Sequence, residues 1–456
     1  MKSSLDTFYK LSNSKWSSLL FWIILIVLGV VILYIRYPFA YTAPNFYGED
    51  GNVIFENIYN NGILQSLFTR FNGYFILLQY LLGYLAYLIN NLIGGELYTL
   101  PKVVALVSYT FFAFACTLPW LLFRNRIGRT ISLILYIFLL LTPLGRSDFA
   151  VLGTLGNLKF IIFYIAFILI IYRNDIKLVP DKSNKFYIID FILLVCALTN
   201  ILVVAILPLA LIRYKDFIIL CIKKREYKKI IYNNNLISIL ALALLLFVYT
   251  IWMYLLGIPK MPGYLDGQLI LSGLINAIIR SSWYGLLYPV YTTLNILVSI
   301  CLIILMFLTV FIKKNRVIYL STIWAIFVVS VGFVLNRPGV TEFLQSYTQD
   351  GGPGQFFYGG TMIFMFSLMY LIHNNFNNTE RKYKALILFI IFIYIAWALP
   401  YAGERSKSYA IYKDRMTSFQ ALKSACQTDN KVIMFNIYPT AGWDMDMRKE
   451  IACRGL

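Results

Sequence analysis

Charged residues are scarce in this sequence. Only 13% of its 456 residues are Asp, Glu, Lys or Arg, about half the share in an average globular chain. So few charged groups do not cover the water-facing surface of a protein of this size, which excludes a soluble globular protein. The 60% hydrophobic content likewise excludes a disordered chain. The composition therefore predicts a membrane protein.

Residues that bind metals are also few. The sequence has one histidine, His373, and six cysteines without a CxxC pair or a Cys/His cluster, which argues against a zinc site. Two of the cysteines, Cys426 and Cys453, lie in the polar tail that follows the last apolar run. If this tail is outside the cell, a disulfide between them can persist. A bridge and two free thiols stay equally open.

Long apolar runs recur along the whole chain, and those at 19–35, 236–256 and 286–312 hold no charged residue. About 20 apolar residues are needed to cross a bilayer as a helix, and runs of this length indicate helices and not barrel strands. We predict an all-α polytopic membrane protein with about 11 transmembrane helices, at 18–36, 102–123, 130–144, 158–172, 187–199, 201–212, 236–256, 286–312, 317–335, 357–373 and 385–400.

The net charge of +19 indicates membrane orientation and not nucleic-acid binding. With the N-terminus in the cytoplasm and the C-terminus extracellular, the inner segments hold 23 of the 40 Lys and Arg residues against 6 acidic ones; these segments are 1–17, 124–129, 173–186, 213–235, 313–316 and 374–384. The basic run at 223–229 is interpreted as a solvated inner loop.

Two regions are predicted. Residues 1–400 form a transmembrane domain, whose outer loop 37–101 carries interfacial helices, and 401–456 form a small extracellular tail. Segment 74–93 is long enough to span, but a span there would move the basic run 124–129 outside. We therefore expect an interfacial or re-entrant helix on the outer side. The tail has a strand-like run within 431–445 and is expected to pack on the outer loops.

The first outer loop contains an acidic pair, Glu49 and Asp50, followed by the pattern of a helix that lies on a membrane. A carboxylate fixed beside the bilayer is placed to take a proton from an acceptor hydroxyl. The alternative, equally weighted, is that the pair caps the following helix and stabilises its first turn.

The second outer loop contains Arg146, Asp148, Asn157 and Lys159. Asp148 is a possible second carboxylate, Arg146 and Lys159 are suited to bind phosphate, and Asn157 is a candidate substrate contact. The alternative is a local Arg146–Asp148 pair, with Lys159 extending from a helix end to the membrane surface.

The later outer loops add further polar groups. Arg337 matches phosphate oxygens in a bidentate way, and Arg280 is a second phosphate candidate or a simple interfacial anchor. Four more residues are candidates to bind sugar hydroxyls or phosphate; they are Gln345, Tyr347, Gln355 and Tyr358. The alternative is an ordinary tight loop around Gly351–Gly354.

Four features together resemble the glycosyltransferase C (GT-C) superfamily, multi-span enzymes that use sugars linked to lipid phosphates. They are the acidic pair after Gly48, the surface-helix patterns behind it, the stretch LPKVVALVSYTFFAFACTLPWLLFRNRIGR (100–129), and Asp148 in the next outer loop. The resemblance covers the layout of about the first 215 residues. It implies a GT-C-like fold and a polyprenyl-phosphate-linked sugar donor.

The resemblance also implies roles. Asp50 would be the general base with Glu49 as its rival, and Asp148 the second carboxylate, while the phosphate-binding residues would be Arg337, Arg280 and Lys159. Relatives that use pyrophosphate lipids hold a metal with the first-loop carboxylate, so a divalent metal stays open and no cofactor is certain. The sequence has no WWDYG-type motif and no His–Pro pair, which argues against protein glycosylation.

The predicted function is therefore an inverting bacterial glycosyltransferase. It would move a sugar from a polyprenyl-phosphate carrier to a cell-envelope glycan or teichoic-acid acceptor at the outer face of the cell membrane. One alternative is a lipid-linked polysaccharide polymerase or ligase, although the large Arg-rich loop that we expect of such enzymes is missing. Another is a lipid or glycolipid flippase or transporter, although the apolar spans offer little polar path.

Overall fold

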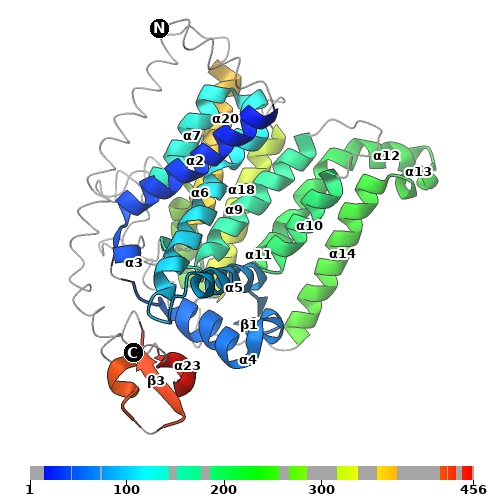
Figure 1. Cartoon of the computed structure of the whole chain (residues 1–456). Coiled ribbons are helices and arrows are strands. Elements are labelled where there is room, and N and C mark those ends of the chain that lie inside the picture. The colour runs from blue at the N-terminus through cyan, green and yellow to red at the C-terminus, as the bar shows by residue number, and fades with distance from the viewer. Residues whose placement is uncertain are drawn as a thin grey trace, which may run out of the picture.

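The computed structural model describes residues 15–42, 44–71, 74–142, 151–175, 185–255, 267–284, 304, 316–336, 357–376, 422–428, 430–437 and 444–453. These residues are mostly helical. The longer helices are α2 (Lys15–Arg36), α6 (Leu100–Ile127), α7 (Arg129–Leu141), α9 (Leu158–Asp175), α10 (Lys185–Ala197), α14 (Asn234–Leu255), α15 (Gly267–Ile279), α18 (Arg316–Asn336) and α20 (Tyr358–Phe376). They form an elongated bundle (Figure 1).

Short elements connect these helices. Before α6 they are α3 (Phe39–Thr42), the π-helix η1 (Asp50–Phe55), α4 (Glu56–Leu67), the strand pair β1 (Arg70–Phe71) and β2 (Tyr74–Phe75), and α5 (Leu77–Leu92). After α10 they are α11 (Leu202–Ile206), the 3-10 helix η3 (Leu207–Tyr214), α12 (Lys215–Lys223), α13 (Tyr227–Ile231) and, later, the π-helix η4 (Arg280–Tyr284).

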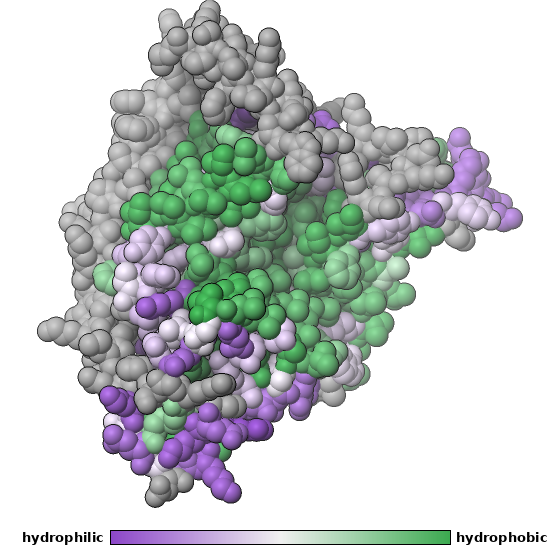
Figure 2. Space-filling model, viewed as in Figure 1, coloured by the Kyte–Doolittle hydropathy of each residue, from purple (hydrophilic) through white to green (hydrophobic). Residues whose placement is uncertain are grey.

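Four helices among the described residues are long and apolar enough to cross a membrane: Ser18–Arg36, Leu100–Ile127, Asn234–Met253 and Val317–Val334. Arg129–Leu141 and Phe186–Ala197 are shorter apolar helices. Figure 2 shows a broad apolar band between a polar end at the foot of the bundle and a polar tip at α12 and α13. The chain thus has the length pattern and surface of a multi-pass membrane protein.

The predicted spans agree with this pattern in part. Predicted spans 158–172 and 357–373 correspond to α9 and α20. The prediction of a regular span at 201–212 is wrong, because this stretch consists of a five-residue α-helix and then a 3-10 helix with Pro208 at its start. Proline lacks an amide hydrogen and breaks regular helix geometry. Except for Ile304, the predicted spans 286–312 and 385–400 lie outside the described residues.

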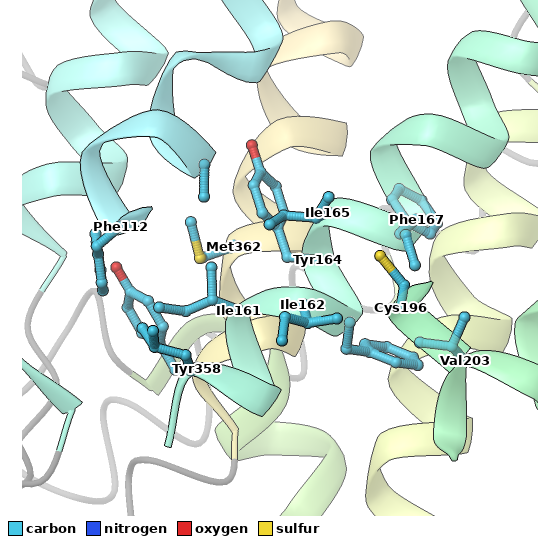
Figure 3. Packing of buried hydrophobic residues seen from close by; sticks show 14 of the residues in the cluster. Phe112, Ile161, Ile162, Tyr164, Ile165, Phe167, Cys196, Val203, Tyr358 and Met362 are labelled. Carbon is cyan, nitrogen blue, oxygen red and sulfur yellow. The ribbon is translucent and has the colours of Figure 1, made fainter. Parts of the chain in front are cut away.

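Helix α9 occupies the centre of the bundle, with nearly every side chain from Leu158 to Ile171 buried. A helix that is apolar on all sides needs neighbours on all sides, and α6, α10 and α20 supply them. Figure 3 shows Ile161 of α9 on the side of Phe112 of α6 and Met362 of α20, and Ile162 on the side of Cys196 of α10. This packing fixes the start of α9, which carries part of the candidate site.

Helix α5 lies within segment 74–93, predicted as an interfacial or re-entrant helix, and is not among the described helices that are long and apolar enough to span. Its 16 residues extend about 24 Å, less than the hydrocarbon core of a bilayer. One face is buried and contains Gly83 and Ala86. The opposite face exposes leucines at helical spacing, namely Leu81, Leu85, Leu88 and Leu92. This two-faced pattern suits a helix that lies in the membrane interface.

A buried ion pair at the C-terminal end of α9 connects four elements. The guanidinium of Arg173 is fully buried and donates from Nε and Nη2 to the Asp190 carboxylate, at 2.7 and 3.1 Å. It also donates to the hydroxyl of Tyr214 and to the carbonyl of Asn235. These bonds join α9, α10, η3 and α14. Pairing the two buried charges offsets the cost of removing them from water.

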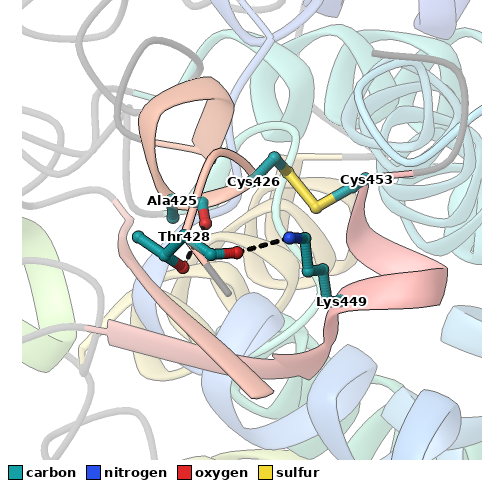
Figure 4. The surroundings of a disulfide bond; sticks show 5 residues. All are labelled: Ala425, Cys426, Thr428, Lys449 and Cys453. Atoms are coloured by element: carbon teal, nitrogen blue, oxygen red, sulfur yellow. Dashed lines mark hydrogen bonds between the residues drawn. A yellow bond between two sulfur atoms is a disulfide. The ribbon is translucent and has the colours of Figure 1, made fainter. Parts of the chain in front are cut away.

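The described part of the tail forms a small unit, here called the C-terminal lobe (residues 422–453). Its antiparallel strands β3 (Val432–Asn436) and β4 (Asp444–Arg448) precede a short helix, α23 (Lys449–Ala452). The Cys426–Cys453 disulfide is present, with 5.7 Å between the Cα atoms. Figure 4 shows this bond beside the Lys449 ammonium, which donates to the carbonyl of Thr428. The predicted strand in this region is confirmed.

Candidate functional site

Asp50 begins η1 and is 1% exposed. Its carboxylate receives backbone N–H groups from a segment about 105 residues further along the chain. Leu155 donates to Oδ1 at 3.1 Å and to Oδ2 at 3.0 Å, and Gly156 donates to Oδ1 at 2.7 Å. Glu49 and Asp50 thus hold the cap and first-turn positions of η1, as the alternative expected. Glu49 makes no side-chain cap bond, and the two side chains bond to residues 155–159.

Burial raises the pKa of Asp50 to about 7, and the neighbouring Glu49 carboxylate acts in the same direction. The amides of Gly156 and Leu155 and the ammonium of Lys159 lower this pKa, but less than burial raises it. Near neutral pH, Asp50 therefore exchanges between its protonated and ionised forms. A carboxyl group with this property is suited to accept or return a proton.

Glu49 forms an ion pair with Lys159, the second residue of α9. The distance from Nζ to Oε2 is 2.8 Å, and the Lys159 side chain is only 4% exposed. The ammonium also lies 5.1 Å from the ring of Phe71 and 5.5 Å from that of Phe160. Lys159 is thus held inside the site, and the alternative that it extends to the membrane surface is wrong.

Gly156 makes this close approach possible, although the sequence reasoning did not identify it. A Cβ at this position would lie 2.8 Å from Glu49 Oε2 and 3.3 Å from Asp50 Oδ1. Only glycine leaves room for both carboxylates beside the backbone. The one sequence signal is its place in the short polar stretch before α9, which also contains Gly153.

The C-terminal lobe packs directly on the segment that carries Asp50. The Ile437 side chain lies against Gly51, leaving no room for a Cβ there. The Asp446 amide donates to Glu56 Oε2 at 3.0 Å, and the Asn60 side chain donates to the Asp446 carbonyl at 3.0 Å. Partial burial raises the pKa of Glu56, which the bond from the Asp446 amide partly opposes. The lobe thus covers one side of η1 and α4, which agrees with the prediction that the tail packs on the polar loops.

The other described candidates are buried as well. Asn157 is buried directly before α9, and Arg280 is buried at the start of η4, where its carbonyl accepts a bond from Thr361 Oγ1 at 3.3 Å. The Tyr358 hydroxyl donates to the carbonyl of Leu139 at 2.9 Å. In this structure Tyr358 therefore connects α20 to α7.

Two glycines at the start of α20 let this helix pack closely on α9 and η4. Gly359 packs on the backbone of Phe160, next to Lys159 in sequence, and Gly360 packs on Ser281, next to Arg280. The starts of α9, α20 and η4 therefore meet at one end of the bundle. Six predicted residues lie outside the described residues, namely Arg146, Asp148, Arg337, Gln345, Tyr347 and Gln355.

The described carboxylates do not suit a divalent metal in this arrangement. Asp50 accepts backbone amides on both oxygens, and Glu49 is paired with an ammonium. Hard cations prefer several oxygen ligands around one point. Among the described residues, no group of three His, Cys, Asp or Glu is placed to hold a metal ion.

Comparison with known proteins adds no relative. No family model, curated protein or solved structure matches this chain. The resemblance to the GT-C superfamily therefore rests on sequence layout alone, and the function has to be argued from the site.

Proposed function

We propose that this protein is an inverting membrane glycosyltransferase of the GT-C type. It transfers a sugar from a polyprenyl-phosphate carrier to a cell-envelope glycan or teichoic-acid acceptor at the outer face of the membrane. The observation that carries this proposal is the buried Asp50 carboxyl beside the Glu49–Lys159 ion pair, at the end of the bundle covered by the C-terminal lobe.

The position of the disulfide supports an outer site. Disulfides persist in oxidising compartments and are rare in the cytoplasm. Because the lobe that contains the bridge bonds to Glu56 and Asn60, the acidic pair lies on the same side as the bridge. Helix α14 leads away from this end: its Tyr249 hydroxyl accepts the Phe75 amide, while its first residue, Asn234, follows the basic elements α12 and α13. Basic segments favour the cytoplasmic side.

In this proposal Asp50 is the general base. It takes the proton of the acceptor hydroxyl as the oxygen attacks the anomeric carbon, and the bond from that carbon to the phosphate oxygen breaks. The lipid phosphate leaves with the electron pair, so that the products are the glycoside, the carrier phosphate and a protonated Asp50. A well-placed base with a pKa near the working pH contributes about 10²–10⁴-fold to the rate.

Lys159 is the described residue best placed to meet the donor phosphate. Its ammonium is buried against two aromatic rings and paired with a carboxylate, so an incoming phosphate can replace or share Glu49 as its partner. A positive charge held there stabilises the negative charge that grows on the leaving phosphate. Asp50 is almost fully buried. We therefore infer that the C-terminal lobe, which packs on η1, moves before the acceptor hydroxyl reaches the Asp50 carboxylate.

The test is transfer from a panel of polyprenyl-phosphate sugars by the purified full-length protein. Asp50→Asn should abolish transfer while the protein still inserts and binds the donor. Asp216→Asn, which changes an exposed carboxylate on α12, serves as the control and should keep full activity. Near-normal transfer by Asp50→Asn would contradict the role of Asp50, and lipid flipping without any transfer would favour a transporter.

A further inference from the structure

Helices α12 and α13 form a pair of short helices that projects from the bundle between η3 and α14 (Figure 1). We call residues 215–232 the basic hairpin. The sequence suggested a solvated loop here. The structure instead contains two helices joined at Arg225, which has a positive φ of 56°. A structured surface presents its side chains in a fixed arrangement, and a solvated loop does not.

The exposed charge of the basic hairpin is strongly positive. Its exposed basic residues are Lys215, Lys223, Lys224, Arg225, Lys228 and Lys229. Only Asp216 and Glu226 are acidic, and Glu226 is paired with Lys229 at 2.9 Å. The surface therefore carries a surplus of cations that suits an anionic partner.

Large apolar side chains are exposed between these cations. Ile219, Leu220, Ile222, Tyr227 and Tyr232 are between 39% and 79% exposed. On α12, Ile219 lies one turn from Lys215 and one turn from Lys223, so that basic and apolar groups share a face. Exposed apolar groups of this size are costly in water, and a surface of this kind is typical of helices that lie in a bilayer interface.

The position of the basic hairpin along the bundle is that expected for the interface of a bilayer. The candidate span of α14 starts at Asn234, directly after the hairpin, so the hairpin lies where the apolar band ends. Figure 2 shows the same change from polar to apolar surface. We propose that the basic hairpin is a docking surface for anionic lipid headgroups of the adjoining leaflet, with Ile219 and Ile222 at the acyl boundary. Nucleic acids offer charge but no apolar layer, and the position of the hairpin at the end of the apolar band favours lipid over a soluble acidic protein.

The experiment uses the full-length protein in nanodiscs of phosphatidylcholine, with and without phosphatidylglycerol, and follows backbone amide exchange over residues 215–233. Phosphatidylglycerol should slow this exchange. In the variant K223Q/K224Q/K228Q, each removed charge should weaken the attraction to the anionic surface by up to about fivefold, so that most of the slowing by phosphatidylglycerol should be lost. The control K423Q/K431Q/R448Q removes the same charge from exposed positions of the C-terminal lobe and should behave as wild type.

Two results would overturn the proposal. One is equal exchange of the basic hairpin with and without phosphatidylglycerol, and the other is an unchanged response in K223Q/K224Q/K228Q. A response that disappears when Ile219 and Ile222 are replaced by Ser, with all charges kept, supports the placement of these two side chains at the acyl boundary. A response that survives this change contradicts that placement.

Discussion

The protonation of Asp50 gives the sharpest quantitative prediction. With a pKa of about 7 in the fold and 3.8 as the ordinary value, the ionised carboxylate costs about 4 kcal/mol more in the fold than in the unfolded chain. The folded state therefore binds the proton more tightly. We expect the free energy of unfolding to fall by about this amount as the pH rises from about 4 to about 7, and to stay level outside that window as far as Asp50 is concerned.

Infrared difference spectroscopy measures this protonation without needing activity. The C=O stretch of a protonated carboxyl group should disappear with a midpoint near pH 7, and the Asp50→Asn variant should lack this band. About nine tenths of the carboxyl should be protonated at pH 6 and about one tenth at pH 8. Asp216→Asn should leave the band unchanged. A midpoint below pH 5, or a band that persists in Asp50→Asn, would refute the electrostatic argument for a base at this site.

Three further predictions follow from the packing. Gly156→Ala should push the two carboxylates apart because the new Cβ lies 2.8 Å from the nearer one; we expect about a 10²-fold loss of transfer, and unchanged transfer would show that their spacing is unimportant. Arg173→Met should lower the free energy of unfolding by about 3–5 kcal/mol because it leaves the buried Asp190 carboxylate unpaired; chemical denaturation measures this, and adding Asp190→Leu should recover part of the loss. Replacing Cys426 and Cys453 by Ser should destabilise the C-terminal lobe by about 3.5 kcal/mol, as expected for a bridge with a separation of 27 residues; amide exchange over 430–453 that matches the wild type would contradict this.

Features that depend on local sequence were the easiest to predict. The apolar runs of α2, α6, α14 and α18 identify candidate spans because length and hydropathy are local properties. The strand β3 was predicted for a similar reason, since its pattern lies in one short polar tail, whereas the sequence left the Cys426–Cys453 disulfide open. The stretch 201–212 failed because a hydropathy count does not register how Pro208 divides the helix.

Features that depend on long-range contacts could not be predicted. The sequence marks Glu49 and Asp50 as unusual, but not that they bond to Lys159 and to the amides of Leu155 and Gly156. No local pattern brings residues 105 positions apart together. The packing of Ile437 on Gly51 is also a long-range contact, because it depends on how the tail folds back over the segment that follows α2.

The side of the membrane on which the acidic pair lies is the claim on which the proposed function depends most. A membrane-impermeant maleimide applied to intact cells tests it with two single-cysteine variants at exposed positions, Val432→Cys on the C-terminal lobe and Lys224→Cys on the basic hairpin. We predict labelling at position 432 in intact cells, and at position 224 only after the cells are opened. Labelling of position 224 but not position 432 in intact cells would place the acidic pair in the cytoplasm and contradict a transferase that works at the outer face.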